Sequence, residues 1–201
     1  MDLTAEIGRC RQNKTERNRE MHERPVYPVR PRLAFYHPNG KCTGGAVAFE
    51  LSPAAGREEG GVFMTMVSQL TVGDRRAPEP TFPTFDWENR ITVFLGFSDL
   101  CKLLQVLRGE CESLENGKGV FHQSSRFNTK ITFRHLVEPV QGYSLEVFRS
   151  EIKGQGEWRS HILISPWEAV GLAEALAGAM TYVSFGVPVM PPARAEISAA
   201  G

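Results

Sequence analysis

The sequence lacks any long apolar run. Its 201 residues include no stretch of about 18 apolar residues, and the first residues have no apolar core of the kind that a secretory signal needs. We therefore expect no membrane span and no membrane partner. The four cysteines, Cys10, Cys42, Cys101 and Cys111, have no CxxC spacing. They favour reduced thiols in a cytoplasmic protein over a disulfide framework.

A net charge is also absent. Lys and Arg together number 23, and so do Asp and Glu. A chain without net charge has no overall electrostatic field that attracts it to nucleic acid or to a membrane. Any anion-binding surface must therefore be local. The length fits one domain with a core large enough to stand alone.

The recognised catalytic motifs are missing as well. The sequence has no HExxH, P-loop, GxSxG or dinucleotide-binding glycine motif. Cys101 lies among leucines, and Cys111 lies between two glutamates that disfavour a thiolate. His122 and His135 have no recognised metal-ligand spacing. We therefore predict that the protein is not an enzyme and holds neither a cofactor nor a metal.

One segment joins a short strand to the start of a long helix. Ser165 is a typical N-cap, Pro166 suits the first helical position, and Glu168 completes a capping box. The pattern predicts a helix over residues 166–183. This helix is apolar around most of its circumference and so needs cover on more than one side. It is expected to be a central core helix, an oligomer interface, or both.

A second segment repeats this design. Ser98 is expected to cap a helix over residues 98–108, in which leucines recur at helical spacing, and Gly109 suits the left-handed residue after a helix. Several strand-like runs precede each helix. We therefore predict an α+β fold of two strand-rich repeats, at about residues 32–114 and 118–186, each ending in a helix. Chance recurrence of strand-to-helix joints is the alternative.

The expected strands are short β-branched or aromatic runs separated by turn residues. They lie at residues 32–37, 45–51, 62–67 and 91–97 in the first repeat, and at 120–123, 126–134, 143–149 and 158–164 in the second.

Both ends of the chain are expected to lie outside this fold. Residues 1–31 are rich in Arg and end in a proline-rich run, which predicts a flexible basic arm. Such an arm either lies on a polyanion or is a solvated extension, and both interpretations stay open. Residues 187–201 are rich in Pro and Ala and are predicted to be disordered.

The most regular strand pattern is basic on one side. From residue 126 to 134, alternation places Arg126, Lys130 and Arg134 on one face and apolar side chains on the other. Between Lys118 and Arg159, Lys and Arg outnumber Glu by seven to four, and aromatic residues are interleaved. Cations neutralise phosphates, and rings stack on unpaired bases at about 1–3 kcal/mol each. The alternative is an exposed sheet face whose charges serve solubility alone.

Four local strings occur in an order that resembles a known family. They are Gly-Ala-Val-Ala-Phe-Glu-Leu-Ser at 45–52, Phe-Asp-Trp at 85–87, Glu-Cys-Glu-Ser-Leu at 110–114 and Ile-Ser-Pro-Trp-Glu at 164–168. Across residues 32–186 they resemble the Whirly family of plant organellar single-stranded-DNA-binding proteins. That family's Lys-Gly-Lys-Ala-Ala-Leu-Ser string is absent, and its acidic, aromatic C-terminal tail is also missing.

The resemblance implies a single Whirly-like domain over residues 32–186. Two antiparallel four-stranded sheets would pack around a helical kernel, a plan shared with positive cofactor four of transcription and with kinetoplastid mitochondrial guide-RNA-binding proteins. The resemblance also implies a homo-oligomer, a dimer or a tetramer, formed through the helices at 98–108 and 166–183. Single strands would run along the sheet edges.

We therefore predict a protein that binds single-stranded nucleic acid, DNA in the first place, with little sequence preference. The residues expected to contact phosphates are Arg126, Lys130, Arg134, Arg149 and, more weakly, Lys41, and those expected to stack on bases are Tyr36, Phe148 and Trp158. Two alternatives stay open: single-stranded RNA as the ligand, and a protein-interaction scaffold of the same fold that binds no nucleic acid. Zero net charge favours the scaffold.

Overall fold

Two antiparallel sheets and two α-helices make up the part of the chain that the structure, a computed structural model, describes. This part is residues 32–187. The predicted basic arm at 1–31 and residues 188–201 of the predicted tail lie outside it.

The first sheet is built from the N-terminal repeat. Its order is β1-β2-β3, and the long strand β3 then pairs with β4 near its C-terminal end and with β5 along residues 62–66. The strands are β1 (Arg32–His37), β2 (Gly45–Ser52), β3 (Gly61–Thr71), β4 (Thr84–Phe85) and β5 (Ile91–Leu95). Four strands were expected here, and the two-residue β4 makes a fifth.

The second sheet is built from the C-terminal repeat and follows the chain order β6-β7-β8-β9. Its strands are β6 (Val120–Gln123), β7 (Phe127–Leu136), β8 (Gly142–Glu151) and β9 (Glu157–Ile164). All neighbours are antiparallel. The four strands predicted for this repeat are confirmed.

The two helices follow the last strand of each sheet. α3 (Pro166–Phe185) begins as predicted, with Ser165 as N-cap and the Glu168 carboxylate accepting a hydrogen bond from the Ser165 backbone N–H at 2.9 Å. α2 (Phe97–Leu107) corrects a prediction, because its N-cap is Gly96 and not Ser98. The Asp99 carboxylate accepts a hydrogen bond from the Gly96 N–H at 3.2 Å, which fixes the start of the helix one residue earlier.

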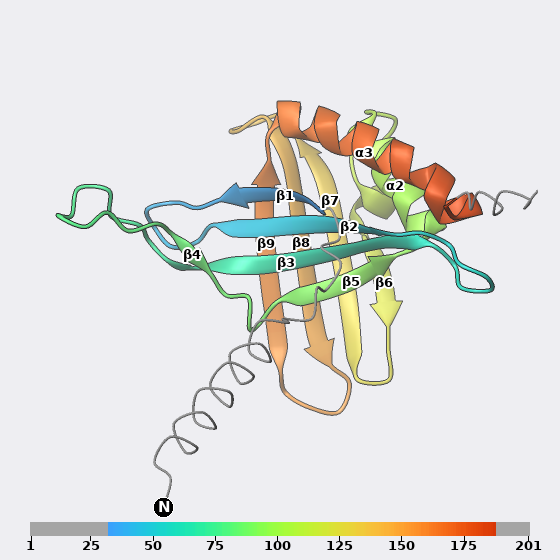
Figure 1. Cartoon of the computed structure of the whole chain (residues 1–201), viewed down its shortest axis with the longest axis horizontal. Coiled ribbons are helices and arrows are strands. Elements are labelled where there is room, and N and C mark those ends of the chain that lie inside the picture. Colours follow the sequence, from blue (N-terminus) through green and yellow to red (C-terminus); the bar gives the residue numbers. More distant parts are fainter. Residues whose placement is uncertain (1–31, 188–201) are drawn as a thin grey trace, which may run out of the picture. The chain divides into compact units, whose positions relative to one another are not determined.

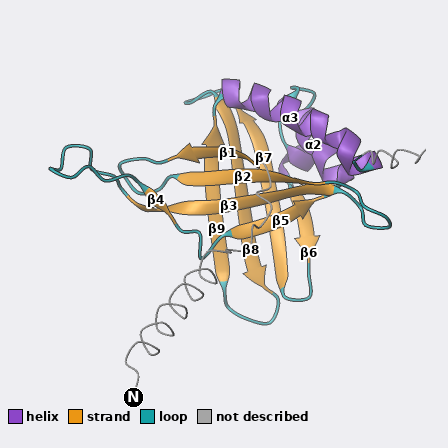
Figure 2. Cartoon of the chain, in the orientation of Figure 1, coloured by secondary structure: helices purple, strands orange, loops and turns teal. Residues whose placement is uncertain are grey.

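The strands of the two sheets run across each other, and α2 and α3 lie together at one end of both (Figures 1 and 2). One apolar core joins the three layers. It includes Met64 and Met66 from the first sheet, Ile131 and Phe133 from the second, and Leu100 and Leu172 from the helices. This is the predicted α+β arrangement of two sheets and a helical kernel.

The sheets approach each other most closely along β9. At Gly45 of β2, an added Cβ would lie 2.3 Å from the backbone oxygen of His161, so only glycine fits there. Nearby, the Ser68 hydroxyl lies 3.5 Å from the Arg159 backbone oxygen. A further link joins the Arg149 guanidinium to the backbone oxygen of Thr92 in β5, at 2.7 Å. These contacts fix the second sheet against the first.

Candidate nucleic-acid interface

The two faces of the second sheet differ in what they contact. Phe133, Leu145 and Ile162 belong to one face, which we call the inner face, and are buried against the first sheet and the helices. Lys130 and Arg134 lie on the opposite, outer face, because residues of β7 alternate. The predicted alternation is confirmed for Lys130 and Arg134. It is wrong for Arg126, which precedes β7 and places its guanidinium against the Phe127 ring.

Two rings and two cations form one row across the outer face. Phe121 of β6 pairs with Lys130 of β7, Lys130 pairs with Phe148 of β8, and Phe148 pairs with Arg159 of β9. We call these four residues the outer row. Neighbouring strands lie about 4.8 Å apart, so the row is about 14 Å long. Residues paired in this way share a face, so the row alternates ring, cation, ring, cation.

The outer row is accessible and partly unpaired. The Phe121 side chain is 67% exposed, and the Lys130 Nζ lies 5.4 Å from the centre of its ring. Among residues 32–187, no salt bridge involves Lys130 or Arg134. Arg159 does have a partner, since its Nε and Nη2 donate to Glu146 Oε1 at 2.9 and 2.8 Å. Such an exposed pair contributes little to stability and can exchange partners.

Arg149 lies on the inner face and has a different setting. Its Nε donates to the Thr129 hydroxyl at 3.0 Å, and its Nη2 donates to the backbone oxygen of Thr92 in the first sheet. Burial lowers the pKa of the Arg149 guanidinium, but arginine still stays charged at neutral pH. The structure therefore separates Arg149 from Lys130 and Arg134 and makes it a link between the sheets.

Arg126 and Trp158 gather with Arg149 around one ring. The guanidinium carbons of Arg126 and Arg149 lie 5.4 and 5.3 Å from the centre of the Phe127 ring. Trp158 meets the same ring edge-on, with centroids 5.8 Å apart. Trp158 faces inward, because it pairs with Arg149. Of the eight predicted residues, three thus surround Phe127, at the start of β7.

Tyr36 and Lys41 belong to the first sheet. Tyr36 is 45% exposed and packs edge-on against Phe85 and Trp87, with centroids 5.5 and 6.5 Å away. Lys41 is exposed in the turn between β1 and β2. The predicted set therefore divides into three groups, and only Lys130, Arg134 and Phe148 share the outer face of the second sheet.

Sequence reasoning did not select Phe121 or Arg159. Both were counted among the basic and aromatic residues of the C-terminal repeat, but nothing local distinguishes them from their neighbours. What places them in the outer row is the register of β6 against β7 and of β8 against β9. No sequence signal in a single strand specifies that register.

The outer face is hollowed beside Arg159. One pocket of about 400 Å³ includes Thr132, Arg134 and Ser144, and a second of about 510 Å³ includes Cys42, Ser68 and His161. Glu146 and Arg159 line both pockets. The cationic end of the outer row thus lies between two concave surfaces.

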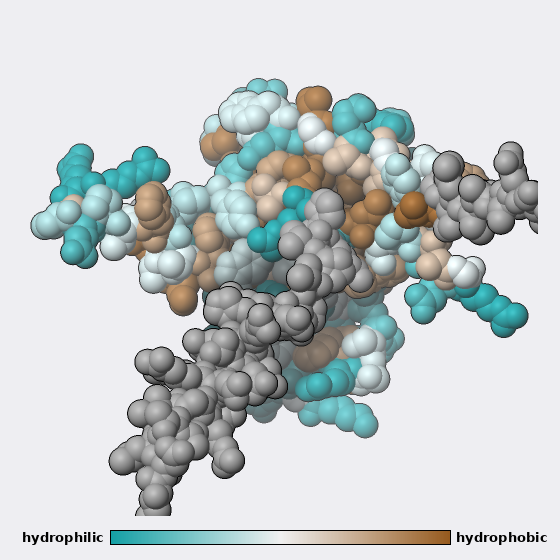
Figure 3. All heavy atoms as spheres, in the orientation of Figure 1, coloured by the Kyte–Doolittle hydropathy of each residue, from teal (hydrophilic) through white to brown (hydrophobic). Residues whose placement is uncertain are grey.

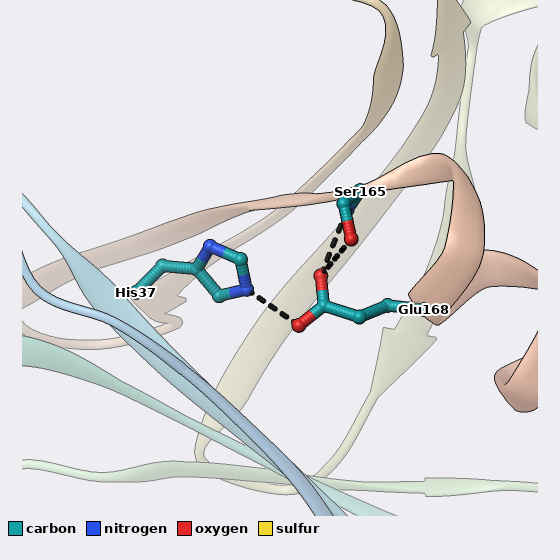
Figure 4. Close-up of polar contacts among 3 residues, drawn as sticks. All are labelled: His37, Ser165 and Glu168. Carbon is teal, nitrogen blue, oxygen red and sulfur yellow. Dashed lines mark hydrogen bonds and ion pairs between the residues drawn. The ribbon is translucent and has the colours of Figure 1, made fainter.

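A Ser-His-Glu grouping near the start of α3 could be mistaken for a catalytic triad. Figure 4 shows that the His37 Nε2 and the Ser165 hydroxyl both point to the Glu168 carboxylate, at 2.9 and 2.5 Å. The hydroxyl therefore does not bond to the imidazole that would have to activate it. Burial acts to raise the pKa of Glu168, but the hydrogen bonds from Ser165 and His37 outweigh it, and the pKa lies below its ordinary value. The three residues form a helix cap tied to β1.

Two other features are absent from residues 32–187. No cluster of three His, Cys, Asp or Glu side chains could hold a metal there. No helix in that part of the chain has the length and apolar character needed to cross a bilayer.

The sequence matches no protein-family profile and no curated protein. Solved structures do match the fold. The plant transcriptional regulator PBF-2 superimposes with a TM-score of 0.61 at 16% identity, covering 79% of this chain and 84% of its own. WHY1 from Arabidopsis thaliana gives 0.59 at 15% identity, covering 78% and 87%. The chain has a Whirly-like fold. A guide-RNA-binding protein complex bound to a guide RNA is also similar, with a TM-score of 0.51 at 17% identity. The match covers 81% of this chain and 99% of the other.

Proposed function

We propose that this protein binds single-stranded nucleic acid, with single-stranded DNA as the expected ligand, on the outer face of the second sheet. The observation that carries the proposal is the outer row, in which Phe121, Lys130, Phe148 and Arg159 alternate rings and cations across four paired strands. A row of about 14 Å is roughly as long as four stacked nucleotides.

The chemistry of the row suits an unpaired strand. Lys130 and Arg134 are exposed or half-exposed and have no carboxylate partner in the described chain, so a phosphate can take that place. Phe121 and Phe148 offer ring faces to bases, which a duplex keeps stacked inside. Every base has a face that can stack, so binding of this kind is tolerant of sequence. Two of the structurally similar proteins are a plant transcriptional regulator and a guide-RNA-binding protein complex, which supports the same class of ligand.

Fluorescence anisotropy tests the proposal directly. Labelled oligo-dT, a single-stranded RNA of equal length and a duplex are titrated with the full chain across a salt series. We expect oligo-dT to bind most tightly and the duplex to compete poorly. Tighter binding of the RNA would identify single-stranded RNA as the ligand. Absence of binding at low salt, or equal competition by the duplex, would reject the proposal.

The site is tested by removing its unpaired cations. The Lys130→Ala, Arg134→Ala double variant should reduce the salt slope of oligo-dT binding by about 1–2 units, because each lost phosphate contact releases one fewer counterion. Arg76→Ala, in the exposed loop between β3 and β4, removes a positive charge away from the second sheet and is the control. An unchanged slope in the double variant would move the binding site elsewhere.

We also propose that α2 and α3 form a homo-oligomer interface. α3 exposes apolar side chains on the surface away from the core, with Trp167 76% and Phe185 85% exposed, and Val170 lies on the same helix. Figure 3 shows hydrophobic surface in the region of the helices. Light scattering on the purified chain measures the mass: a dimer or tetramer is expected, and a monomer at micromolar concentration would contradict it.

The same exposed helix favours a second candidate function, a protein-interaction scaffold without nucleic-acid binding. The ratio of absorbance at 260 and 280 nm in the purified protein separates the two. Copurified nucleic acid that high salt removes supports the binding function, and its absence together with no binding in the titration supports the scaffold.

A binding role in the cytoplasm is proposed in preference to a catalytic one. Cys42, Cys101 and Cys111 are free thiols, which is typical of a reducing compartment. A single cysteine that reacts with iodoacetamide much faster than free cysteine at neutral pH would reopen the catalytic interpretation.

A further inference from the structure

A pocket of about 380 Å³ lies between the two sheets beside β9. Ser68, Asp86 and Asn89 line it from the first sheet and the turn between β4 and β5, and Trp158 and Ser160 line it from β9. This volume is at the lower end of what small-molecule sites occupy, so it suits one planar group and not a chain.

Ser160 is a buried polar group without a partner. Its residue is 4% exposed, and its hydroxyl has no hydrogen bond with any other group in the described chain. Buried hydroxyls are nearly always hydrogen-bonded, because an unpaired one loses its bonds to water. An unpaired hydroxyl in the wall of a pocket therefore points to a ligand that supplies the missing bond.

Trp158 gives the pocket an aromatic wall. The indole is half-buried, and its contact with Phe127 is edge-on, at an interplanar angle of 84°. An edge-on contact holds the ring in place without covering both of its faces. The indole thus contributes ring surface to the lining of the pocket, which a flat aromatic ligand can contact.

The charges in the pocket select a base over a phosphate. Asp86 and Glu157 both line it, and Asp86 is held in place by the Asn89 backbone N–H and side-chain amide at 3.1 and 2.8 Å. The guanidinium of Arg159 donates to Glu146 on the outer face. Carboxylates repel phosphate, but they accept hydrogen bonds from the exocyclic amino group of a base.

The pocket shares Arg159 with the outer row. Arg159 ends that row, and Arg159 and Ser68 line both this pocket and the 510 Å³ pocket on the outer face. A strand that crosses the outer row toward β9 therefore reaches the pocket by passing around β9.

We propose that this pocket binds one base of the bound strand and prefers bases with an exocyclic amino group, namely cytosine, adenine and guanine, over thymine and uracil. The proposal rests on the proposed function and adds one selective position to a surface that is otherwise tolerant of sequence.

The test compares oligo-dT with the same oligomer in which one central thymine is replaced by cytosine or adenine. The full chain should bind the substituted oligomers about tenfold more tightly, the scale of one hydrogen bond to a charged acceptor. Asp86→Asn and Ser160→Ala should each remove most of this preference while oligo-dT still binds. Glu88→Gln removes the same charge two residues from Asp86, outside the pocket lining, and should leave the preference unchanged.

The outcomes separate the two proposals. If no oligomer binds, the proposed function itself fails. Two results overturn the pocket proposal and leave the proposed function standing. In the first, oligo-dT binds, but replacing a thymine by cytosine or adenine does not increase the affinity. In the second, Ser160→Ala raises stability and leaves the preference for cytosine or adenine unchanged. Competition by free cytidine or adenosine below millimolar concentration would assign the pocket to a free nucleoside and overturn the strand-base proposal. A base that stacks on Trp158 should quench its fluorescence, and the Trp158→Phe variant should lose this quenching. The fluorescence signal is thus an independent readout of stacking in the pocket.

Discussion

Positively charged side chains on the two faces of the second sheet have different surroundings. Arg149 on the inner face donates to Thr129 and to the backbone of the first sheet, and it lies over the Phe127 ring. Lys130, on the neighbouring strand, lies on the outer face against the exposed Phe121 ring and has no carboxylate partner in the described chain. The comparison teaches that the role of a basic residue in a strand depends on the face of the sheet on which it lies. The inward Arg149 links the two sheets, whereas the outward Lys130 has no carboxylate partner in residues 32–187.

The largest effect should come from the inward cation. Arg149→Met removes hydrogen bonds from a charged donor and leaves the backbone oxygen of Thr92 without that donor. We expect the free energy of unfolding to fall by about 2–3 kcal/mol. Urea denaturation measures it, with Arg134→Met as the outward control, expected to change stability by about 0.5 kcal/mol or less. If Arg149→Met instead leaves stability unchanged and weakens binding, the division between the faces is wrong.

The next effect concerns the rings. Phe121→Ala should weaken oligo-dT binding by about 1–3 kcal/mol, the contribution of one stacked base, with little change in stability because the side chain is 67% exposed. Phe82 is a matched control, since it is 72% exposed and lies just before β4 in the first sheet. Equal losses from Phe82→Ala and Phe121→Ala, measured by anisotropy, would show that the outer row has no special role.

A smaller effect tests the other link between layers, in which His37 of β1 contacts Glu168 of α3. Glu168→Gln should lower the free energy of unfolding by about 1 kcal/mol at neutral pH, as for loss of a helix cap. The folded pKa of Glu168 is lowered, so its contribution is full above about pH 4.3 and is lost as pH falls through the folded value. Urea titrations at several pH values should show the two proteins converging in acid. A gap that stays constant down to pH 2 would contradict this assignment.

The smallest effect is expected on the first sheet. Lys41→Ala should reduce oligo-dT affinity about twofold to threefold at low salt and change the salt slope by about 1 unit or less. Tyr36→Ala is measured beside it, because Tyr36 stays a predicted stacking residue. If either variant weakens binding more than Lys130→Ala does, the first sheet and not the second provides the main surface.

Local chemistry made part of this structure predictable. The capping box at Ser165 and Glu168 uses residues three apart, so sequence alone placed the start of α3. The alternation of β7 likewise placed Lys130 and Arg134 on one face. The start of α2 was predicted one residue late, because Gly96 and not Ser98 is its N-cap, and the Asp99 carboxylate accepts the Gly96 N–H.

The placement of Arg149 and Lys130 on different faces could have been predicted from the sequence. Leu145, Val147 and Arg149 alternate along β8, and the two apolar members indicate which face the third shares. The outer row was not predictable in the same way. It depends on which residue of β6 lies opposite Lys130 and which residue of β9 lies opposite Phe148, and those pairings are set by turns and core packing across the whole sheet.

Ultraviolet cross-linking of a bromodeoxyuridine oligomer, followed by mass spectrometry of the peptides, tests the central claim most directly. It compares rings within one chain and needs no variant. We predict cross-links at Phe121 and Phe148, on the outer face of the second sheet. Cross-links at Tyr36, Phe85 or Trp87 of the first sheet, with none at Phe121 or Phe148, would contradict the account.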